Sequence, residues 1–399
     1  MFCKFCSNKI KPFFSFGRMP MANGFLKKKH FKKEFFYKLE VGICKKDFLF
    51  QVNDHPKSPH IFNNHYPFYT NKSVTMKKHF FKYFNWSKKF LNKNSKIIEI
   101  GSNDGTFLKN YKSAGYSHLG IEPSKNVAQF SKKINKVNVK NEFFNYKNCK
   151  KNKKFLSKTD LICAANVISH IPNLNDLIKS IDLMLSRKGV FVFEEPYLGS
   201  MFKKISYDQI YDAHIFIFSI HSVMEIFKKY EFELVDALPQ ITHGGSMRYV
   251  LSRKGVRKPT ANLKKLFKKE KKLKLYSLSS CIEFKKACIK SKNKFKKIIS
   301  KIIKSGKSIA GYAASAKSST VMNFCKINHN HLSFIADSTA EKIGKFTPGT
   351  HIPIVSVNHF RKNYPDYTLL CSWNHGAEIK KKERKFTLQG GKWISHVKN

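Results

Sequence analysis

One short segment restricts the fold of this chain more than any other. The letters KIIEIGSNDGTFL, residues 96–108, place an apolar run ahead of a turn that holds Gly101 and Gly105, and a helical stretch follows from about Thr106. Such a run is typical of a buried strand in a parallel sheet. Glycines at its end let the backbone come close to a ligand, where open α/β sheets bind their ligands. The segment predicts an α/β domain with a ligand site at the end of this strand.

The rest of the chain extends this pattern. Between residues 76 and 255, apolar runs such as SHLGIEP, DLICAANV, GVFVFEEP and FELVDAL alternate with helical stretches, which predicts a β-α-β domain with a parallel sheet. Residues 256–305 predict a connector of one or two amphipathic helices, with a calmodulin-like or membrane-surface helix as the alternative. Residues 306–399 return to strand-like runs and predict a second α/β unit. Residues 1–75, aromatic and rich in Pro and Asn, predict short strands and loops.

A carboxylate ends the next apolar run. HLGIE closes with Glu122, about 20 residues after the glycine turn, where a carboxylate can accept hydrogen bonds from both hydroxyls of a ribose. The turn reads E-x-G-x-x-x-G rather than G-x-G-x-x-G, which favours S-adenosylmethionine over a dinucleotide. A solvated strand end is the alternative for Glu122. The candidate cofactor residues are Gly101, Asn103, Asp104, Gly105, Glu122 and Asn166.

A third apolar run, DLICAANVISH, brings two more polar side chains to the same edge. Because parallel strands end at one edge of a sheet, Asn166 and His170 are expected near the glycine turn. Asn166 is a candidate for holding the methionine part of the cofactor. His170 is either an active-site residue or a histidine satisfied in the core, and the sequence alone does not separate these two interpretations.

The net charge of +50 would usually indicate a polyanion partner. The lysines, however, are spread through every segment instead of gathering in one arm or along one helix, and arginine is scarce. A compositional bias explains this at least as well, so we expect no specific nucleic acid partner. No run approaches the roughly 20 apolar residues of a membrane span, and the start MFCKFCSNKIK has no apolar signal core. We therefore expect a cytoplasmic protein without a membrane partner.

With these motifs in view, the chain resembles the bacterial sugar-nucleotide C-methyltransferases. The resemblance covers nearly the whole chain. It rests on CKFC followed by FGRMPMANGFL, on EIGSNDGTFL, GIEPSKNVA and NVISHIPNLNDL, on YDAH and HGGSMR, and on PGTHIPI, PDYTLLCSWNHGAEI and the final GGKW. It implies an α/β fold: a class I Rossmann-like domain for S-adenosylmethionine, a small N-terminal zinc-binding domain and a second Rossmann-like domain at the C-terminus. It also implies methyl transfer to the carbon beside the ketone of a nucleoside-diphosphate 4-keto-deoxysugar.

The resemblance also implies roles for individual side chains. Members of the family carry a Tyr-His-Glu-His motif whose last histidine is the base; here Tyr211 and His214 match it, while Ala213 replaces the glutamate. Asp212, one residue earlier, could compensate for this loss, but on a helix or an extended segment it would point elsewhere. Tyr66 is the favoured aromatic hydroxyl over the active site, ahead of Tyr69. The catalytic candidates are therefore His214, Tyr211, Tyr66 and His170.

The segment HGGSMR matches the substrate segment of the same family. His243, Gly244, Gly245, Ser246 and Arg248 are expected to face the sugar or its phosphates, because two glycines expose backbone N–H groups and the arginine adds a cation. A tight turn with an exposed arginine is the alternative. In the C-terminal unit Asp337 ends a strand like a ribose anchor. Trp373, Asn374 and Glu378 stand in its most recognisable stretch, where packing and substrate contact are equally compatible with the sequence.

Four residues form a candidate zinc site. Cys3 and Cys6 give one C-x-x-C knuckle, and the second knuckle of the family reads Cys44-Lys45-Lys46-Asp47 here, with Gln51 after it as in the family. Three thiolates and a carboxylate can bind zinc, although more weakly than four thiolates. Ordinary buried thiols in a domain that folds without metal are the alternative.

Two other functions remain open at this stage. One is methyl transfer to an oxygen or nitrogen of a small metabolite, and the other is nucleic-acid binding through the positive charge. The sequence does not determine the oligomeric state, and a monomer is compatible with it.

Overall fold

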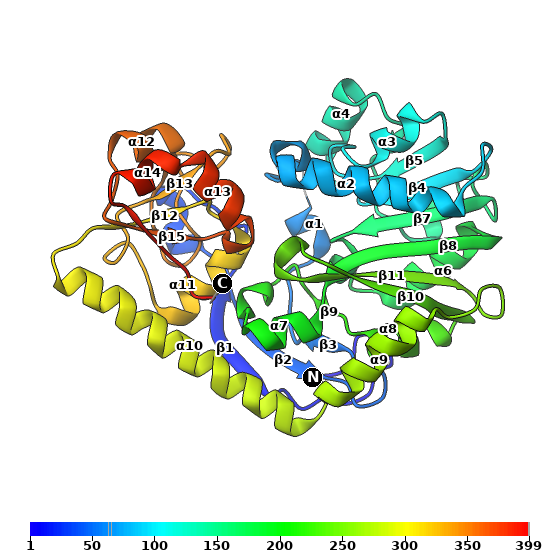
Figure 1. Cartoon of the computed structure of the whole chain (residues 1–399), viewed down its shortest axis with the longest axis horizontal. Helices are drawn as coiled ribbons and strands as arrows, with labels where there is room; N and C mark the ends of the chain where they lie inside the picture. The colour runs from blue at the N-terminus through cyan, green and yellow to red at the C-terminus, as the bar shows by residue number, and fades with distance from the viewer. Residues whose placement is uncertain (63, 65, 398–399) are drawn as a thin grey trace.

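The structure, a computed structural model, describes residues 1–62, 64 and 66–397. It contains a seven-stranded sheet in the middle of the chain, a four-stranded sheet mostly from the N-terminal part and a five-stranded C-terminal sheet (Figure 1). The seven-stranded sheet has the order β10-β11-β8-β7-β4-β5-β6. Its strands are β4 (Lys96–Ile100), β5 (Ser117–Ile121), β6 (Val139–Lys140), β7 (Thr159–Ala165), β8 (Leu185–Pro196), β10 (Phe232–Gln240) and β11 (Ser246–Arg253).

The seven-stranded sheet is mixed, not purely parallel as the apolar runs predicted. Strands β4 to β8 pair in parallel, and β11 runs antiparallel to both β8 and β10. The sequence concealed β11 because SMRYVLS is buried along its whole length, which removes the alternation that marks a half-exposed strand. The strand begins at Ser246, so the HGG residues form the turn that enters it.

Helices cover both faces of this sheet. On one face, α2 (Val74–Ser87) packs its aromatic side chains against Ile97 and Leu161. On the other, α6 (Leu174–Met184) and α8 (Ile220–Lys228) pack against Ile98 and Ile162. Successive strand residues thus point to opposite layers, as the twofold period of a strand requires. The remaining helices of this part are α3 (Leu108–Ser113), α4 (Lys125–Ile134), α5 (Tyr146–Cys149) and α7 (Leu198–Lys204).

The N-terminal sheet takes one strand from the central part of the chain. Its order is β1 (Phe14–Pro20), β2 (Phe36–Ile43), β3 (Phe50–Val52) and β9 (Phe216–Ile217), and β9 pairs antiparallel with β3. Because β9 starts two residues after His214, this pairing fixes the imidazole next to the N-terminal sheet. The short α1 (Ser58–Ile61) then leads toward the segment that contains Tyr66.

The C-terminal sheet is parallel throughout its order β14-β13-β12-β15-β16. Its strands are β12 (Ile309–Tyr312), β13 (Ile335–Asp337), β14 (Ile354–Ser356), β15 (Tyr367–Leu370) and β16 (Lys392–Ile394), with helices α11 (Ala316–Cys325), α12 (Val357–Lys362), α13 (Gly376–Lys382) and α14 (Arg384–Leu388). Helix α11 joins the other two parts: Ser319 Oγ donates to the Ala22 carbonyl at 2.8 Å and Thr320 Oγ1 donates to the Ile210 carbonyl at 2.7 Å.

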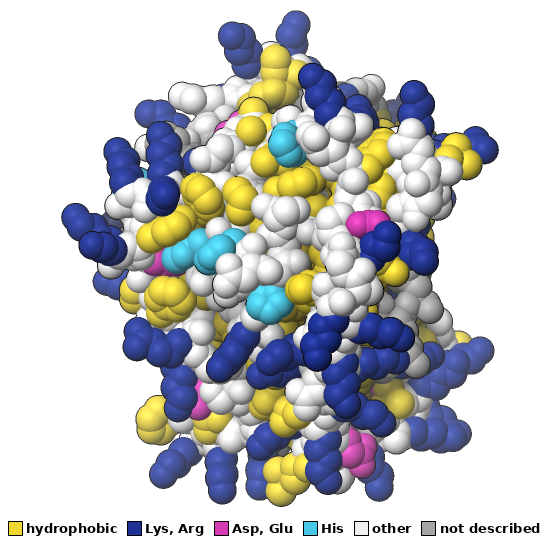
Figure 2. All heavy atoms as spheres, turned by 90° about the vertical axis from the view of Figure 1, so that its left-hand side faces the viewer, with side chains coloured by type: hydrophobic (Ala, Val, Ile, Leu, Met, Phe, Trp, Pro, Cys, Tyr) yellow, Lys and Arg dark blue, Asp and Glu magenta, His cyan; other side chains and the backbone are white. Residues whose placement is uncertain are grey.

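Two helices connect the two larger sheets. They are α9 (Ala261–Leu273) and α10 (Leu278–Lys304), and α10 runs along the lower edge of Figure 1 toward the C-terminal sheet. Thr260 and Ser277 cap them by accepting backbone N–H groups of the first turn. Within the described part of the chain, no helix combines the length and apolar character that crossing a membrane requires. Figure 2 shows lysines and arginines spread over one face of the molecule, with few acidic side chains among them.

Candidate active site and metal centre

The glycine turn after β4 has the conformation that its sequence predicted. Gly101 and Gly105 have φ angles of 64° and 77°, in the left-handed region that disfavours a side chain. A Cβ at Gly101 would lie 2.3 Å from Cγ2 of Val167, and one at Gly105 would lie 2.5 Å from Oγ of Ser131. Both positions therefore require glycine, for conformation and for space.

Glu122 ends β5 beside this turn. Its carboxylate is 4% exposed and accepts the N–H of Asn103 at 2.9 Å and the N–H of Ser124 at 2.8 Å. Burial raises the pKa of Glu122, and the backbone N–H groups oppose that shift. Each carboxylate oxygen can accept a second hydrogen bond, so each keeps a lone pair for a ribose hydroxyl.

A segment ahead of α2 packs over the turn, in a contact that sequence reasoning missed. Thr70 donates its N–H and its hydroxyl to Oδ1 of Asn103, both at 3.1 Å. The N–H of Asn71 reaches Oδ2 of Asp104 at 2.7 Å. In return, Nδ2 of Asn103 donates to the carbonyl of Phe68 at 3.1 Å. The segment from Phe68 to Asn71 therefore forms one wall of the candidate cofactor site.

Unpartnered buried groups make the site fit S-adenosylmethionine. Among the described residues, Oε2 of Glu99, Oγ of Ser102 and Oδ1 of Asn166 are buried without a hydrogen-bond partner. Burial raises the pKa of Glu99, and Asp104 and Glu122 add to the shift because their negative charges lie nearby. Three buried carboxylates around one glycine turn suit a cofactor that carries a sulfonium, an ammonium and two ribose hydroxyls.

The Tyr211–His214 pair lies in the same interior. Nδ1 of His214 faces the carbonyl of Gln209 at 2.7 Å, so this nitrogen carries the proton. Nε2 then has a lone pair, which accepts the hydroxyl of Tyr211 at 2.8 Å. His214 is 4% exposed, and burial lowers its pKa well below the usual value, with the nearby His170 and Lys317 acting in the same direction. The imidazole is therefore neutral and held in one tautomer.

His170 lies in the turn that follows β7 and faces the Tyr211–His214 pair. Its ring centroid lies 5.1 Å from that of His214, and its Nδ1 is buried without a partner among the described residues. Burial lowers the pKa of His170 to about 4, so this ring is neutral as well. Nδ1 is therefore free for a further hydrogen bond, and the active-site role of His170 stays a prediction.

Tyr66 lines a cavity of about 230 Å³ next to these residues. The cavity is bounded by Met21 to Phe25 of the N-terminal part, by Asp212, and by Lys342 and Lys345 of the C-terminal part. Tyr69 has another role: its hydroxyl accepts Nδ2 of Asn126 at 3.0 Å. Tyr66 lines this cavity and Tyr69 does not, and the role of Tyr66 over the active site stays a prediction.

Asp212 does not take the place of the glutamate that Ala213 replaces. Both of its oxygens accept the N–H of Ala22, at 3.3 and 3.2 Å. Ala213 is 4% exposed and packs with Ala22 and Tyr211. This position is therefore apolar, and Asp212 points to the N-terminal segment as expected.

The HGG segment forms a strained turn against the C-terminal sheet. His243, Gly244 and Gly245 all have positive φ, and a Cβ at Gly244 would lie 2.4 Å from Cη2 of Trp373. Ser246 donates its hydroxyl to the Thr242 carbonyl at 3.1 Å.

The C-terminal residues singled out from the sequence have packing contacts in the structure. Trp373 packs on the HGG turn and donates Nε1 to Asp208 at 2.8 Å. Glu378 accepts the hydroxyl of Thr75 at 2.5 Å, and Asn374 lies half-buried beside Trp373. Asp337 accepts the N–H of Thr339 at 2.7 Å, as a strand-end carboxylate does when it caps a turn.

Arg248 is buried in an ion pair. Its Nε lies 2.6 Å from Oε1 of Glu194, and the guanidinium stacks 3.8 Å from the ring of Tyr83. The side chain is 5% exposed, so a turn with an exposed arginine is wrong for this position. Because the guanidinium is occupied by Glu194, we do not assign it to a substrate phosphate.

Glu195 is a buried acid that sequence reasoning missed. It follows Glu194 in β8, and its Oε1 accepts the N–H groups of Val167 and Ser169 at 2.7 and 3.1 Å. Burial raises the pKa of Glu195 to about 7. The signal was the pair of glutamates in GVFVFEEP, at the end of a strand that reaches the ligand edge of the sheet.

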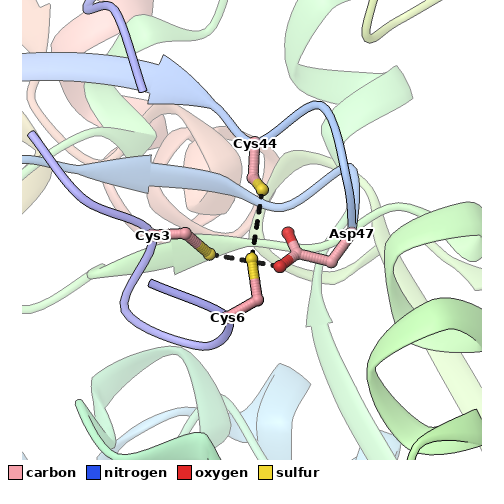
Figure 3. A group of neighbouring side chains, drawn as sticks. All are labelled: Cys3, Cys6, Cys44 and Asp47. Carbon is pink, nitrogen blue, oxygen red and sulfur yellow. Dashed lines mark hydrogen bonds between the residues drawn. The ribbon is translucent and has the colours of Figure 1, made fainter. Parts of the chain in front are cut away.

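Cys3, Cys6, Cys44 and Asp47 converge on one point, as the sequence predicted. Figure 3 shows the four side chains pointing toward one another, and their ligand atoms lie within 4.8 Å of one another. Sγ of Cys3 is 3.2 Å from Oδ2 of Asp47, and Sγ of Cys6 is 3.6 Å from Sγ of Cys44. Thiolates bound tetrahedrally to zinc lie about 3.8 Å apart, given a Zn–S bond of about 2.3 Å. The donor set and its spacing therefore fit zinc.

Gln51 braces this cluster. Its side chain accepts the N–H of Lys4 at 3.0 Å and donates to the carbonyl of Phe2 at 2.9 Å. These two bonds hold the first knuckle against β3.

The strand order, the glycine turn at the end of β4 and the acidic end of β5 together define a class I S-adenosylmethionine-dependent methyltransferase. Three family models match the chain: "Putative zinc binding domain" at residues 3–62, "Methyltransferase domain" at residues 78–237, and "C-methyltransferase C-terminal domain" at residues 241–397. The chain is therefore an S-adenosylmethionine-dependent methyltransferase that resembles, over nearly its whole length, a C-methyltransferase with these three domains.

Individual relatives are distant. C-methyltransferase NovU of Streptomyces niveus is 24% identical over 387 residues, which are 95% of this chain and 91% of the relative. Among solved structures, the PH0226 protein of Pyrococcus horikoshii OT3 is 15% identical and covers 48% of this chain and 97% of its own, with a TM-score of 0.39. Magnesium protoporphyrin IX methyltransferase of Synechocystis PCC 6803 is 11% identical, with 45% and 84% coverage and a TM-score of 0.36.

Proposed function

We propose that this enzyme methylates the ring carbon next to the ketone of a nucleoside-diphosphate 4-keto-deoxysugar. The observation that carries the proposal is the buried, neutral imidazole of His214, whose Nε2 lone pair points into the interior while Nδ1 is bonded to a backbone carbonyl. Such a group is suited to take a proton from carbon. The substrate class comes from the sequence resemblance described above.

Tyr211 and His214 would have different roles in the proton-transfer step. Substrate binding would separate Tyr211 from Nε2 of His214, and Nε2 would then take the proton from the carbon beside the ketone. The electron pair of the broken C–H bond moves into an enolate. Burial keeps the Tyr211 hydroxyl protonated, because its pKa is raised well above the usual value, so it can donate a hydrogen bond to the enolate oxygen.

Other residues hold the reactants. Bound S-adenosylmethionine would supply an electrophilic methyl group. Glu122 would accept hydrogen bonds from the two ribose hydroxyls. Asn166 and Glu99 would bind the amino-acid end of the cofactor. The glycine turn from Gly101 to Gly105 would let the backbone approach the cofactor. His170 and Tyr66, whose rings both lie beside Phe62, would offer hydrogen bonds to the sugar. Positioning of this kind accounts for much of the rate gain when two bound molecules react.

The zinc cluster would act on structure, not on chemistry. Two of the four candidate ligands precede β1 and two lie in the turn between β2 and β3, and β3 pairs with β9 two residues after His214. Zinc would lock the fold of the N-terminal sheet and so fix the wall behind the imidazole.

A panel of nucleoside-diphosphate 4-keto-sugars with methyl-labelled S-adenosylmethionine tests this proposal. We expect a product on at least one sugar, with the labelled methyl bonded to carbon by nuclear magnetic resonance. A methyl on oxygen or nitrogen, or turnover only with substrates that lack a ketone, would contradict it. Glu122→Gln should raise the KM for the methyl donor, whereas Glu231→Gln, an exposed control, should not.

A further inference from the structure

A buried lysine without an acidic partner lies between the two larger sheets. Lys317, in the first turn of α11, is 8% exposed. Its only hydrogen bond among the described residues goes to the carbonyl of His243, at 3.4 Å, and it takes part in no ion pair within 4.0 Å there. Burial lowers its pKa to about 8. A buried ammonium is costly unless an anion compensates it, so this position calls for one.

The nearest acid does not supply that anion. Asp208 is completely buried and raises the pKa of Lys317, but the two form no ion pair within 4.0 Å among the described residues. Oδ2 accepts Nε1 of Trp373 at 2.8 Å, and Oδ1 lies 3.2 Å from Nε2 of His396. Asp208 thus holds Trp373 and His396 of the C-terminal domain in place.

Other groups that could contact an anion lie near the same point. Lys204, exposed on α7, donates to the carbonyl of Gly244 at 2.7 Å, next to the carbonyl that Lys317 contacts. Nε2 of His243 is buried without a partner among the described residues. The N-terminus of α11, capped by Ser315, adds the positive end of a helix dipole. Two lysines, one deep and one at the surface, therefore flank the HGG turn.

One residue connects this cluster to the candidate base. Gln209 accepts Nδ1–H of His214 through its carbonyl at 2.7 Å, and its side-chain amide donates to the carbonyl of His243. That carbonyl is the one that Lys317 contacts. An anion held by Lys317 would therefore lie one residue away from the imidazole.

We propose that Lys317 and Lys204 bind the diphosphate of the nucleoside-diphosphate sugar and thereby place the sugar ring beside His214. This inference rests on the proposed function and adds the residues that read the diphosphate. Ammonium groups act as point charges toward phosphate. The two lysines would bind the phosphates, which Arg248 does not do because it is bonded to Glu194. Lys317 is the deep contact, and Lys204 is the contact at the entrance.

Calorimetric titration of the full chain with dTDP, UDP, GDP and inorganic pyrophosphate tests the site. We expect Lys317→Met to weaken binding of the preferred diphosphate at least about 10-fold and Lys204→Met to weaken it about 3-fold, because each removes one phosphate contact. Lys203→Met, next to Lys204 on α7 and exposed, has the same change in net charge and should bind like the wild type. Affinity for S-adenosylhomocysteine should be the same in all four proteins, which verifies folding.

The outcomes separate this site from the proposed function. Unchanged diphosphate affinity in Lys317→Met, or no binding of any of the four probes to the wild type at millimolar concentration, would overturn the anion site. Methylation of a sugar nucleotide with an unchanged KM in Lys317→Met would overturn it too, while the proposed function stands. Conversely, charge-dependent diphosphate binding without carbon methylation of any 4-keto-sugar would support the site and contradict the function.

Discussion

The guanidinium of Arg248 and the carboxylate of Glu194 form an ion pair in which neither side chain is more than 5% exposed, with Nε 2.6 Å from Oε1. Nε2 of His79 lies 2.6 Å from the other oxygen of Glu194. The pair joins the antiparallel strand β11 to β8 and holds α2 against the sheet. It is a structural contact in a segment whose sequence pointed to substrate.

Arg248→Met should destabilise the protein because it leaves the carboxylate of Glu194 buried with less compensation. We expect a loss of about 3 to 5 kcal/mol in the free energy of unfolding. The double variant Arg248→Met, Glu194→Gln should recover part of that loss, since no charge is left unpaired. Denaturant titration measures both. A loss below about 1 kcal/mol in the single variant would show that the pair does not support the fold.

Glu195 should make stability depend on pH. Its folded pKa is about 7, above the ordinary value of 4.5, so the folded chain keeps a proton that the unfolded chain releases between these values. The stabilising contribution of the protonated form is complete below pH 4.5 and is lost as the pH rises through 7. Glu195→Gln removes this titration. Its free energy of unfolding relative to wild type should therefore rise by roughly 2 to 3 kcal/mol from pH 5 to pH 8. A flat difference for Glu195→Gln would refute the assignment.

The zinc cluster predicts one zinc ion per chain after purification without chelator. Asp47→Cys should retain zinc against a chelator for longer than the wild type, because four thiolates bind zinc more tightly than three and a carboxylate. Asp54→Cys, an exposed control, should not. Elemental analysis combined with thermal unfolding checks both variants. Purified wild type with no bound metal, and the same melting temperature with and without zinc, would rule the site out.

Glu122 should control cofactor affinity through two contacts. Its oxygens brace the N–H groups of Asn103 and Ser124 and keep lone pairs for a ribose. We expect Glu122→Ala to weaken S-adenosylhomocysteine binding by at least about 10-fold, which is about 1.4 kcal/mol. Calorimetry measures this directly. An unchanged affinity would place the ribose elsewhere.

The sequence predicted the features that depend on neighbouring residues. The glycine turn, Glu122 and the two zinc knuckles each lie in a short segment. The types and spacing of the residues within each segment were enough to predict them. The contacts that sequence reasoning missed join distant segments. Thr70 reaches Asn103, and Lys317 reaches the carbonyl of His243. Strand β9, at Phe216–Ile217, pairs with β3, at Phe50–Val52, although the two strands are far apart in the sequence. Pairings of this kind depend on three-dimensional packing, which no local pattern records.

Buried charges were the second limit of sequence reasoning. Arg248 looked like an exposed phosphate ligand because arginine is seldom buried, and only the position of Glu194 shows its partner. Lys317 gave no signal among so many lysines until its burial was known. In a chain with a net charge of +50, the lysines with a function differ from the solvated ones by burial and partners, not by residue type.

The most direct test of the central claim is exchange of solvent deuterium into the substrate carbon with no methyl donor present. The account predicts that the wild type exchanges the proton next to the ketone of its sugar nucleotide, and that His214→Asn slows this exchange by about 10² to 10⁴-fold while binding S-adenosylhomocysteine normally. His329→Asn, an exposed histidine change, should exchange like the wild type. Exchange at the wild-type rate in His214→Asn would contradict the account, because the proton would then be taken by another group.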